Sequence, residues 1–167
     1  MLARQLLAIL LLPFTMTVMV PLWIARRDHT TLTAPDDVVA VVSIGAGVAL
    51  LAIGLGLFVS SVFYFWSIGR GTLAPWDPPR NFVVAGPYRF VRNPMISGVI
   101  FVLAAEALIL RSLPHAEWAG IFAGLNMIYI PLLEEPRLRA RFGQPYVRYT
   151  QAVRRFLPRL RPWTPAG

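Results

Sequence analysis

The feature that most constrains this chain is the run of residues 38–66, in which 29 consecutive residues carry no charged side chain. About 20 apolar residues are enough for a helix to cross a bilayer, so this run predicts a membrane-spanning helix that is tilted or protrudes. Apolar residues make up 56% of the chain, above the share typical of soluble domains. Three further apolar segments are residues 5–25, 95–110 and 116–133. The sequence therefore predicts an all-α, polytopic membrane protein with about four transmembrane helices.

The last two segments are separated only by residues 111–115, so we expect a helical hairpin with His115 in a solvated loop. Glu106 falls mid-way along the first arm of this hairpin, where a carboxylate is costly enough to suggest a function. Two interpretations of Glu106 remain open. Its side chain faces a substrate path, or it is neutral and hydrogen-bonds Asn126 in the facing arm.

The basic residues of the chain predict its orientation. All 16 are arginines, and thirteen lie on one side of a four-helix topology: Arg4, four within residues 69–93 and eight after Leu133. Only Arg26, Arg27 and Arg111 lie on the other side. The positive-inside rule therefore places both termini and residues 69–93 in the cytoplasm. Contact with lipid headgroups would explain most of these arginines equally well.

A strongly basic chain also suggests nucleic acid as a partner. No recognised nucleic-acid module is present, however, and the arginines flank membrane segments, so no nucleic-acid partner is expected. The use of arginine to the exclusion of lysine is typical of a GC-rich prokaryotic genome. We therefore predict a protein of the cytoplasmic (inner) membrane whose functional surface is cytoplasmic and arginine-rich, formed by residues 78–94 and the tail after Leu133.

The N-terminal half is predicted to anchor the protein. Arg4 before an apolar run resembles a secretory signal, but the run ends at Arg26 without a small-x-small cleavage site. The segment is therefore expected to remain in the protein as a membrane anchor. A stripe of small residues in the second segment suits either helix packing within the chain or a homodimer. It consists of Gly45, Gly47, Gly54 and Gly56. The chain has no cysteine, which excludes disulfides and thiolate zinc sites, and no metal site is predicted.

Local signals predict where the later helices begin and end. Residues 69–93 are rich in proline and glycine and should form an ordered, largely non-helical connection. Asn93 followed by Pro94 is a helix-start signal, with Asn as N-cap and Pro at the first helical position. The positive end of this helix dipole would stabilise an anionic group, although a plain cap needs no ligand.

The C-terminal part predicts two short helices. The fourth segment continues through the carboxylates Glu134 and Glu135 into a helix that ends at Phe142, with Gly143 as its stop. Pro145 then opens an amphipathic cytoplasmic helix that lies on the membrane or caps the domain. Its two predicted faces are Tyr146, Tyr149, Val153 and Phe156 on the apolar side, and Arg148, Gln151, Arg154 and Arg155 on the polar side.

Two sequence blocks stand out from this background: GPYRFVRNPMISG over residues 86–98, and EEPRLRARFGQPYVRYTQAVRRFLP over residues 134–158. In this order, and separated by a hairpin, they resemble the membrane-integral methyltransferases of the isoprenylcysteine carboxyl methyltransferase and phospholipid methyltransferase type. Length and apolar patterning predict a single membrane domain over residues 1–167 with anchor helices in 1–68, and the resemblance, which covers the C-terminal part of the chain, implies a cofactor-binding methyltransferase core in 69–158. It also implies S-adenosylmethionine as the cofactor.

The resemblance can be carried over position by position. In the family the first block reads G-x-Y-x-x-x-R-H-P-x-Y-x-G and the second E-E-x-x-L-x-x-x-F-G-x-x-Y-x-x-Y. The implied cofactor-binding residues are Arg80, Asn81, Phe82, Val83, Tyr88, Arg92, Asn93, Pro94, Met95, Ile96, Gly98, Glu134 and Glu135. Arg92 and Glu135 are the implied catalytic residues. The chain has Asn93 where the family usually has histidine, Ile96 where it has tyrosine, and Ile130 where the isoprenylcysteine enzymes hold their substrate with an arginine.

These residue types also suit the cofactor on chemical grounds. S-adenosylmethionine carries a sulfonium, an ammonium and a carboxylate, so its site needs acids, a cation and an apolar cover for the adenine. Glu134 or Glu135 could take the ammonium, Arg92 and the start of the third helix the carboxylate, and Tyr88 or Phe90 the ring. Ordinary alternatives are an ion pair of the acidic residues with Arg137 or Arg139 at a helix end, and a snorkelling Arg92.

Methyl transfer is an in-line displacement, in which the enzyme mainly aligns donor and acceptor and excludes water. A carboxylate acceptor needs no base, whereas an ammonium acceptor must first lose a proton, for which Glu135 and Glu134 are the nearby bases. The predicted acceptor is a lipophilic small molecule or lipid delivered by the bilayer. Two other functions are weighed: an NADPH-dependent membrane reductase of the sterol-reductase type, and a non-enzymatic small membrane scaffold.

Overall fold

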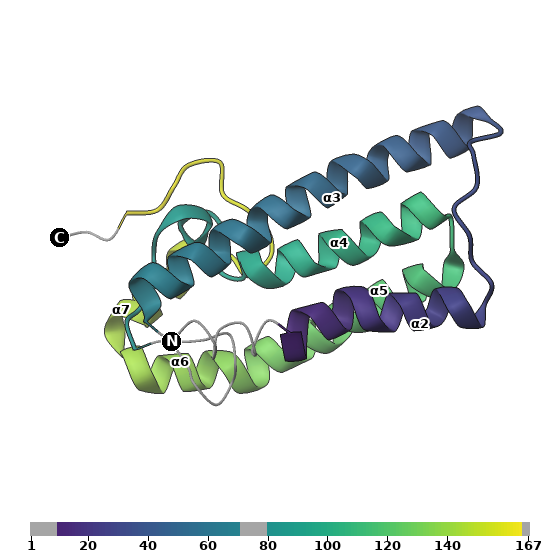
Figure 1. Ribbon diagram of the computed structural model, residues 1–167. Coiled ribbons are helices and arrows are strands. Elements are labelled where there is room, and N and C mark those ends of the chain that lie inside the picture. The colour runs from purple at the N-terminus through teal and green to yellow at the C-terminus, as the bar shows by residue number, and fades with distance from the viewer. Residues whose placement is uncertain (1–9, 71–79, 165–167) are drawn as a thin grey trace. The chain divides into compact units, whose positions relative to one another are not determined.

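The structure is a computed structural model that describes residues 10–70 and 80–164, and all regular elements in these ranges are helical (Figure 1). The predicted all-α class is therefore confirmed for the described part of the chain. Arg4, Pro75, Pro78 and Pro79, on which parts of the predicted topology depend, lie outside the described residues. The chain divides into two compact units, Met1–Gly56 with Gly98–Ala123, and Leu57–Ser97 with Gly124–Gly167, called unit 1 and unit 2.

Within residues 10–70 and 80–164, two helices are long and apolar enough to cross a membrane, judged by length and composition alone. One is the 32-residue helix Val38–Gly69, which consists of α3 (Val38–Tyr64) and the π-helical η2 (Phe65–Gly69). The other is the 30-residue helix Leu113–Phe142, made of α5 (Leu113–Tyr129), the π-helical η4 (Ile130–Glu134) and α6 (Glu135–Phe142). The number of four spans and their orientation remain predictions.

The helical hairpin and its start signal have the predicted form. Helix α4 (Pro94–Leu110) is apolar and 17 residues long, and it begins at the proline that the sequence marks as its first position. Asn93 stands at the N-cap, since its carbonyl accepts the Ser97 N–H at 3.0 Å. Only Arg111 and Ser112 connect α4 to α5.

In unit 1, α3 and α4 lie side by side (Figure 1). The Ser43 hydroxyl on α3 donates a hydrogen bond to the Leu108 carbonyl on α4 at 2.9 Å. A Cβ built on Gly54 would lie only 2.8 Å from the Gly98 carbonyl oxygen, and one on Gly47 would overlap α4 similarly. Helix packing is therefore confirmed for these two glycines of the stripe. An added Cβ would meet nothing within 4 Å at the other two positions, Gly45 and Gly56.

The first apolar segment is irregular because of its prolines. It consists of the π-helical η1 (Leu10–Met19), which contains Pro13, and α2 (Val20–Arg27), which has Pro21 in its first turn. Proline lacks the N–H that an α-helix needs, so a wider helical turn is the expected result. The Trp118 indole N–H on α5 donates to the Met16 carbonyl of η1 at 3.1 Å, which joins the two helices.

The prediction that His115 is a solvated loop residue is wrong. The connection between α4 and α5 is so short that His115 falls within α5, where its side chain is 2% exposed. Its Nδ1 lies 2.8 Å from the Ser112 hydroxyl and its Nε2 lies 3.2 Å from the Pro21 carbonyl oxygen. Because a carbonyl only accepts, Nε2 carries the hydrogen. His115 therefore connects α5 to α2.

In unit 2, α6 ends as predicted and α7 ends early. Gly143 follows α6 with a φ of +60°, a left-handed value that favours glycine, and its N–H donates to Arg139 at 2.9 Å. Helix α7 is Gln144–Ala152, so the predicted helix does not extend to Phe156. Val153 is extended instead, because the chain beyond it forms hydrogen bonds to the segment before α4 rather than to α7.

Candidate active site

The two sequence blocks meet at one carboxylate. Glu135, at the start of α6, is 8% exposed and accepts contacts from two guanidinium groups. Arg92 Nη1 lies 3.0 Å from Glu135 Oε1. Arg155 forms a fork, with Nε 2.6 Å from Oε1 and Nη2 2.9 Å from Oε2. The predicted pair Arg92 and Glu135 is thus brought together, and Arg155 joins it from the tail.

Glu134, the other carboxylate of the pair, has a different environment. It is the last residue of the π-helical turn η4, which contains Pro131. Within the described residues no ion pair or hydrogen bond engages its side chain, which is partly buried. The two adjacent acids are therefore unequal, since arginines hold Glu135 and no arginine of the described residues holds Glu134.

Tyr88 is half-buried in unit 2, on the short 3₁₀ helix η3 (Gly86–Arg89). Burial raises the pKa of the Tyr88 hydroxyl well above its ordinary value, the negative charge of Glu134 adds to that effect, and a hydrogen bond with Ser61 opposes it. The Tyr88 carbonyl accepts the Tyr149 hydroxyl at 2.6 Å. Tyr88 thus stays neutral, close enough to Glu134 to feel its charge.

Gly86 explains why η3 takes this position. Its φ is +53°, and a Cβ added there would overlap the ring of Tyr64 at the end of α3. Only glycine therefore fits without displacing Tyr64 or straining the backbone.

A hydrophobic cluster rich in aromatic side chains supports the arginine–carboxylate group. Its buried members are Tyr146, Tyr149 and Val153, and the half-buried residues around them include Phe82, Phe142 and Trp163. The Phe82 ring lies 5.2 to 5.7 Å from the rings of Phe142, Tyr146 and Tyr149. Arg92 also hydrogen-bonds the Tyr146 hydroxyl, whose pKa burial raises to about 12. Helix α7 therefore caps unit 2 through its tyrosines.

The tail runs along the segment that carries Arg92. The backbone N–H of Arg92 donates to the Arg154 carbonyl at 2.9 Å, and that of Asn93 to Arg155 at 3.3 Å. Further along, the Arg159 N–H donates to Phe90 at 2.9 Å. The side-chain amide of Asn93 donates to the Arg155 carbonyl as well, at 3.3 Å. This pairing fixes both arginines relative to Glu135.

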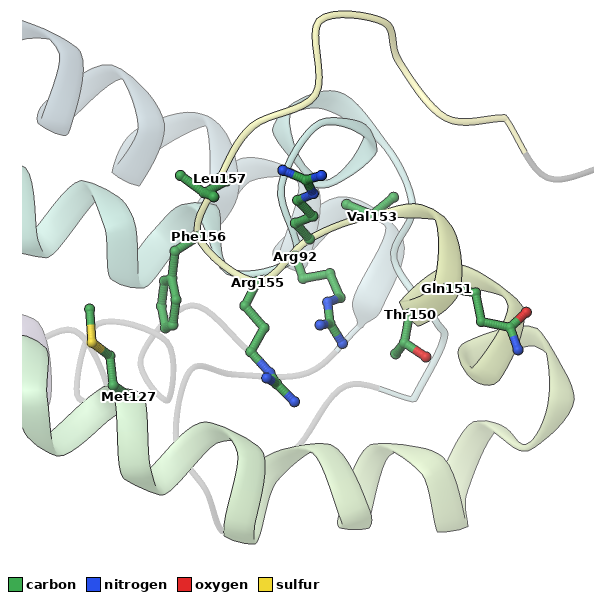
Figure 2. A pocket seen from close by; sticks show the side chains of 9 residues that line it. Arg92, Met127, Thr150, Gln151, Val153, Arg155, Phe156 and Leu157 are labelled. Atoms are coloured by element: carbon green, nitrogen blue, oxygen red, sulfur yellow. The ribbon is translucent and has the colours of Figure 1, made fainter.

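A pocket of about 460 Å³ opens beside this pairing (Figure 2). In Figure 2, Met127, Phe156 and Leu157 lie at the left of the pocket, and Arg92 and Arg155 extend in the same direction at its centre. The volume is within the range of small-molecule sites. The complete lining is Arg92, Met127, Thr150, Gln151, Val153, Arg154, Arg155, Phe156 and Leu157.

The other predicted cofactor residues are spread more widely. Arg80 and Asn81 are exposed, Val83 and Pro94 are buried, and Phe82, Met95 and Ile96 are half-buried. Asn81 donates its side-chain amide to the Ile68 carbonyl at 2.9 Å. Gly98 belongs to unit 1, where its carbonyl packs against Gly54. Of the predicted site residues, only Arg92 lines the pocket.

Sequence reasoning missed Arg155 and Ser61. The 3.6-residue pattern placed Arg155 on a polar helix face, and no local signal reveals that the helix stops three residues before it. The hydrogen bond to Glu135 raises the pKa of the Arg155 guanidinium by more than burial lowers it. Arg155 therefore remains a cation. Ser61 is fully buried within α3 and donates to the Leu57 carbonyl at 2.6 Å.

Comparison with known proteins gives one match. The family model of phospholipid methyltransferases matches residues 42–145, more than half of the chain, and this range contains Arg92, Glu134 and Glu135. No curated protein and no solved structure matches the chain. The matched range contains the whole first block and the acidic pair, as the resemblance in the sequence predicts. A family of phospholipid methyltransferases implies methyl transfer at a membrane. The chain belongs to the phospholipid methyltransferase family.

Proposed function

We propose that this protein transfers a methyl group from S-adenosylmethionine to a lipophilic acceptor that reaches it from the bilayer. The observation that carries the proposal is the Arg92–Glu135 ion pair at 3.0 Å, which joins the two sequence blocks at a buried position. The family match supports the reaction class, and the two long apolar helices support a membrane location.

The charged groups of unit 2 fit the amino-acid part of the cofactor. Nε of Arg92 is buried without a hydrogen-bond partner in the described part of the chain, on a side chain that is only 11% exposed. A buried donor without a partner is costly, so a ligand carboxylate there would relieve that cost. The unengaged carboxylate of Glu134 is the matching group for an ammonium. Phe90 and the N–H groups at the start of α4 remain proposed as further contacts.

When bound, S-adenosylmethionine would supply a methyl group on a sulfonium sulfur, which departs as a neutral thioether and needs no acid catalysis. The chain has to orient both partners and exclude water. Both oxygens of Glu135 already accept hydrogen bonds from Arg155, so its proposed role is to hold the two arginines. For an amine acceptor we propose Glu134 as the group that accepts the proton, since its oxygens are not occupied by arginine.

A thermal-unfolding experiment on the purified protein in a neutral detergent tests this function. A ligand present at about 100 times its Kd stabilises the folded state by about 2.7 kcal/mol, so S-adenosylmethionine should raise the Tm and NADPH should not. Transfer of a tritiated methyl group to a total lipid extract should follow. Stabilisation by NADPH alone would favour the reductase, and stabilisation by neither ligand would favour the scaffold.

A further inference from the structure

Ser61 is a buried polar side chain to which the proposed methyl transfer assigns no role. It lies on α3 within unit 2 and is fully buried. Its hydroxyl forms two hydrogen bonds, one with the Leu57 carbonyl at 2.6 Å and one with the Tyr88 hydroxyl. A serine that only satisfies its own helix needs the first bond alone. The second bond connects Ser61 to a residue of the first sequence block.

The direction of these two bonds follows from the hydrogens that are available. A carbonyl oxygen only accepts, so the single hydrogen of the Ser61 hydroxyl points to Leu57. Tyr88 must therefore donate its own hydrogen to Ser61 Oγ. That hydrogen is present near neutral pH, because burial and the charge of Glu134 both raise the pKa of Tyr88. The Tyr88 hydroxyl is thus left with lone pairs only for any further partner.

The backbone of Tyr88 is held in place by other contacts. Its carbonyl accepts the Tyr149 hydroxyl at 2.6 Å. Two residues earlier, Gly86 lies so close to the Tyr64 ring that an added Cβ would overlap it. These contacts fix the position of the Tyr88 side chain, and Ser61 fixes the direction of its hydroxyl hydrogen.

The carboxylate of Glu134 acts on the Tyr88 hydroxyl through its charge, which places the two groups near each other. No arginine of the described residues holds Glu134, whereas two arginines hold its neighbour Glu135. A hydroxyl hydrogen directed at Glu134 would satisfy part of its charge. Because Ser61 takes that hydrogen, the oxygens of both residues remain acceptors, and a cation with several N–H groups suits them.

We propose that Ser61 is a positioning residue for the methyl donor: by taking the Tyr88 hydrogen, it leaves the oxygens of Tyr88 and Glu134 to accept the N–H groups of the donor's ammonium. An ammonium has three hydrogens to donate and no lone pair, so it matches a set of acceptors. Ser61 acts through Tyr88 and does not touch the donor. The inference rests on the proposed function, since it concerns the binding of S-adenosylmethionine.

Calorimetric titration of the full-length protein in dodecyl maltoside tests this role. In Ser61→Ala the Tyr88 hydrogen loses its acceptor and turns to Glu134, where it competes with the ammonium. Affinity for S-adenosylmethionine should fall about tenfold, the usual effect of one hydrogen bond to a charged group. Ser61→Thr keeps the hydroxyl and should restore most of the affinity.

Ser60→Ala is the matched control. It removes a neighbouring hydroxyl that donates to the same Leu57 carbonyl at 3.1 Å, and it should bind the donor as the parent does. Equal donor affinities in Ser61→Ala and Ser60→Ala would refute the role of Ser61.

A double-mutant cycle with Tyr88→Phe separates positioning from packing. Phenylalanine has no hydroxyl hydrogen to misdirect, so adding Ser61→Ala to Tyr88→Phe should cause no further loss of donor affinity. A cavity or a loosened helix would instead reduce affinity by the same factor in both backgrounds. Additive losses would therefore overturn the proposal, even where each variant is less stable than the parent.

S-adenosylhomocysteine identifies the group of the donor that the two acceptors receive. It keeps the ammonium and lacks the charge on sulfur. Ser61→Ala should therefore weaken its binding by the same factor as that of S-adenosylmethionine. A loss confined to S-adenosylmethionine would assign the acceptors to the sulfonium and overturn the assignment to the ammonium.

Failure of this inference and failure of the proposed function give different results. A parent protein that binds neither ligand refutes both. Donor binding by the parent that is unchanged in Ser61→Ala refutes the inference and leaves the proposed function standing.

Discussion

Arg155 and Glu135 form a two-bond fork across 20 residues of sequence, with Nε to Oε1 at 2.6 Å and Nη2 to Oε2 at 2.9 Å. This geometry requires a planar guanidinium, and lysine could not reproduce it. The same Oε1 atom also contacts Arg92 at 3.0 Å. Glu135 is thus the point at which the α4 start, α6 and the tail are held together.

Glu135→Gln should destabilise the protein. Removing the charge leaves the largely buried guanidinium of Arg92 without its ion-pair partner, and breaking a buried pair costs about 3 kcal/mol or more. Thermal unfolding in detergent should show a clearly lowered Tm. Glu117→Gln, on an exposed residue of α5, is the matched control and should melt with the parent. A Glu135→Gln variant that melts with the parent would show that the ion pair adds nothing to stability.

Glu134→Gln should have the opposite pattern. No arginine holds Glu134 in the described part of the chain, so its loss should leave the Tm nearly unchanged. If it contacts the donor's ammonium, S-adenosylmethionine binding should weaken by about 1.5–3 kcal/mol, the usual contribution of a hydrogen bond to a charged group. Calorimetric titration measures this loss. Unchanged affinity would leave Glu134 without a role in donor binding.

Gly86→Ala should unfold the region around Tyr88. The φ of +53° disfavours any residue with a Cβ, and the new methyl group would overlap Tyr64. The expected cost exceeds about 1 kcal/mol, with a matching fall in Tm. Gly45→Ala is the control, because nothing lies within 4 Å of its added Cβ and alanine is the better helix former. Equal Tm values for the two variants would contradict this account.

Single-cysteine labelling in intact cells should establish the orientation. The chain has no cysteine, and Leu32 and Leu160 are both well exposed, so each can be replaced without a background signal. The distribution of arginines predicts that a membrane-impermeant maleimide labels Leu32→Cys, whereas Leu160→Cys reacts only after permeabilisation. The reverse pattern would mean an inverted protein.

Signals that act over a few residues predicted the structure well. Pro94 begins α4 and Gly143 follows α6, because a missing N–H and a left-handed φ have local effects. Arg92 and Glu135 were expected to bind different groups of the cofactor, so their direct ion pair was not predicted. Local rules therefore accounted for the start of α4 and the end of α6, but not for this pairing.

Long-range contacts account for what the sequence could not predict. The tail leaves helical geometry at Val153 because the backbone of Arg92 supplies a hydrogen-bond partner some 60 residues away, which helical periodicity does not register. Arg155 consequently points to Glu135 instead of to solvent. His115 is buried for a similar reason, since the Pro21 carbonyl that it contacts comes from the first helix.

All of the pocket residues except Arg92 and Met127 lie beyond residue 145, where the match to the family ends. Substitutions in that short stretch would reshape the pocket while the shared core stayed unchanged. The ligand of the pocket could then change while Arg92, Glu134 and Glu135 stayed the same. For proteins of this architecture, a shared core would indicate the reaction. The tails would have to be compared separately before the substrate of one relative is assigned to another.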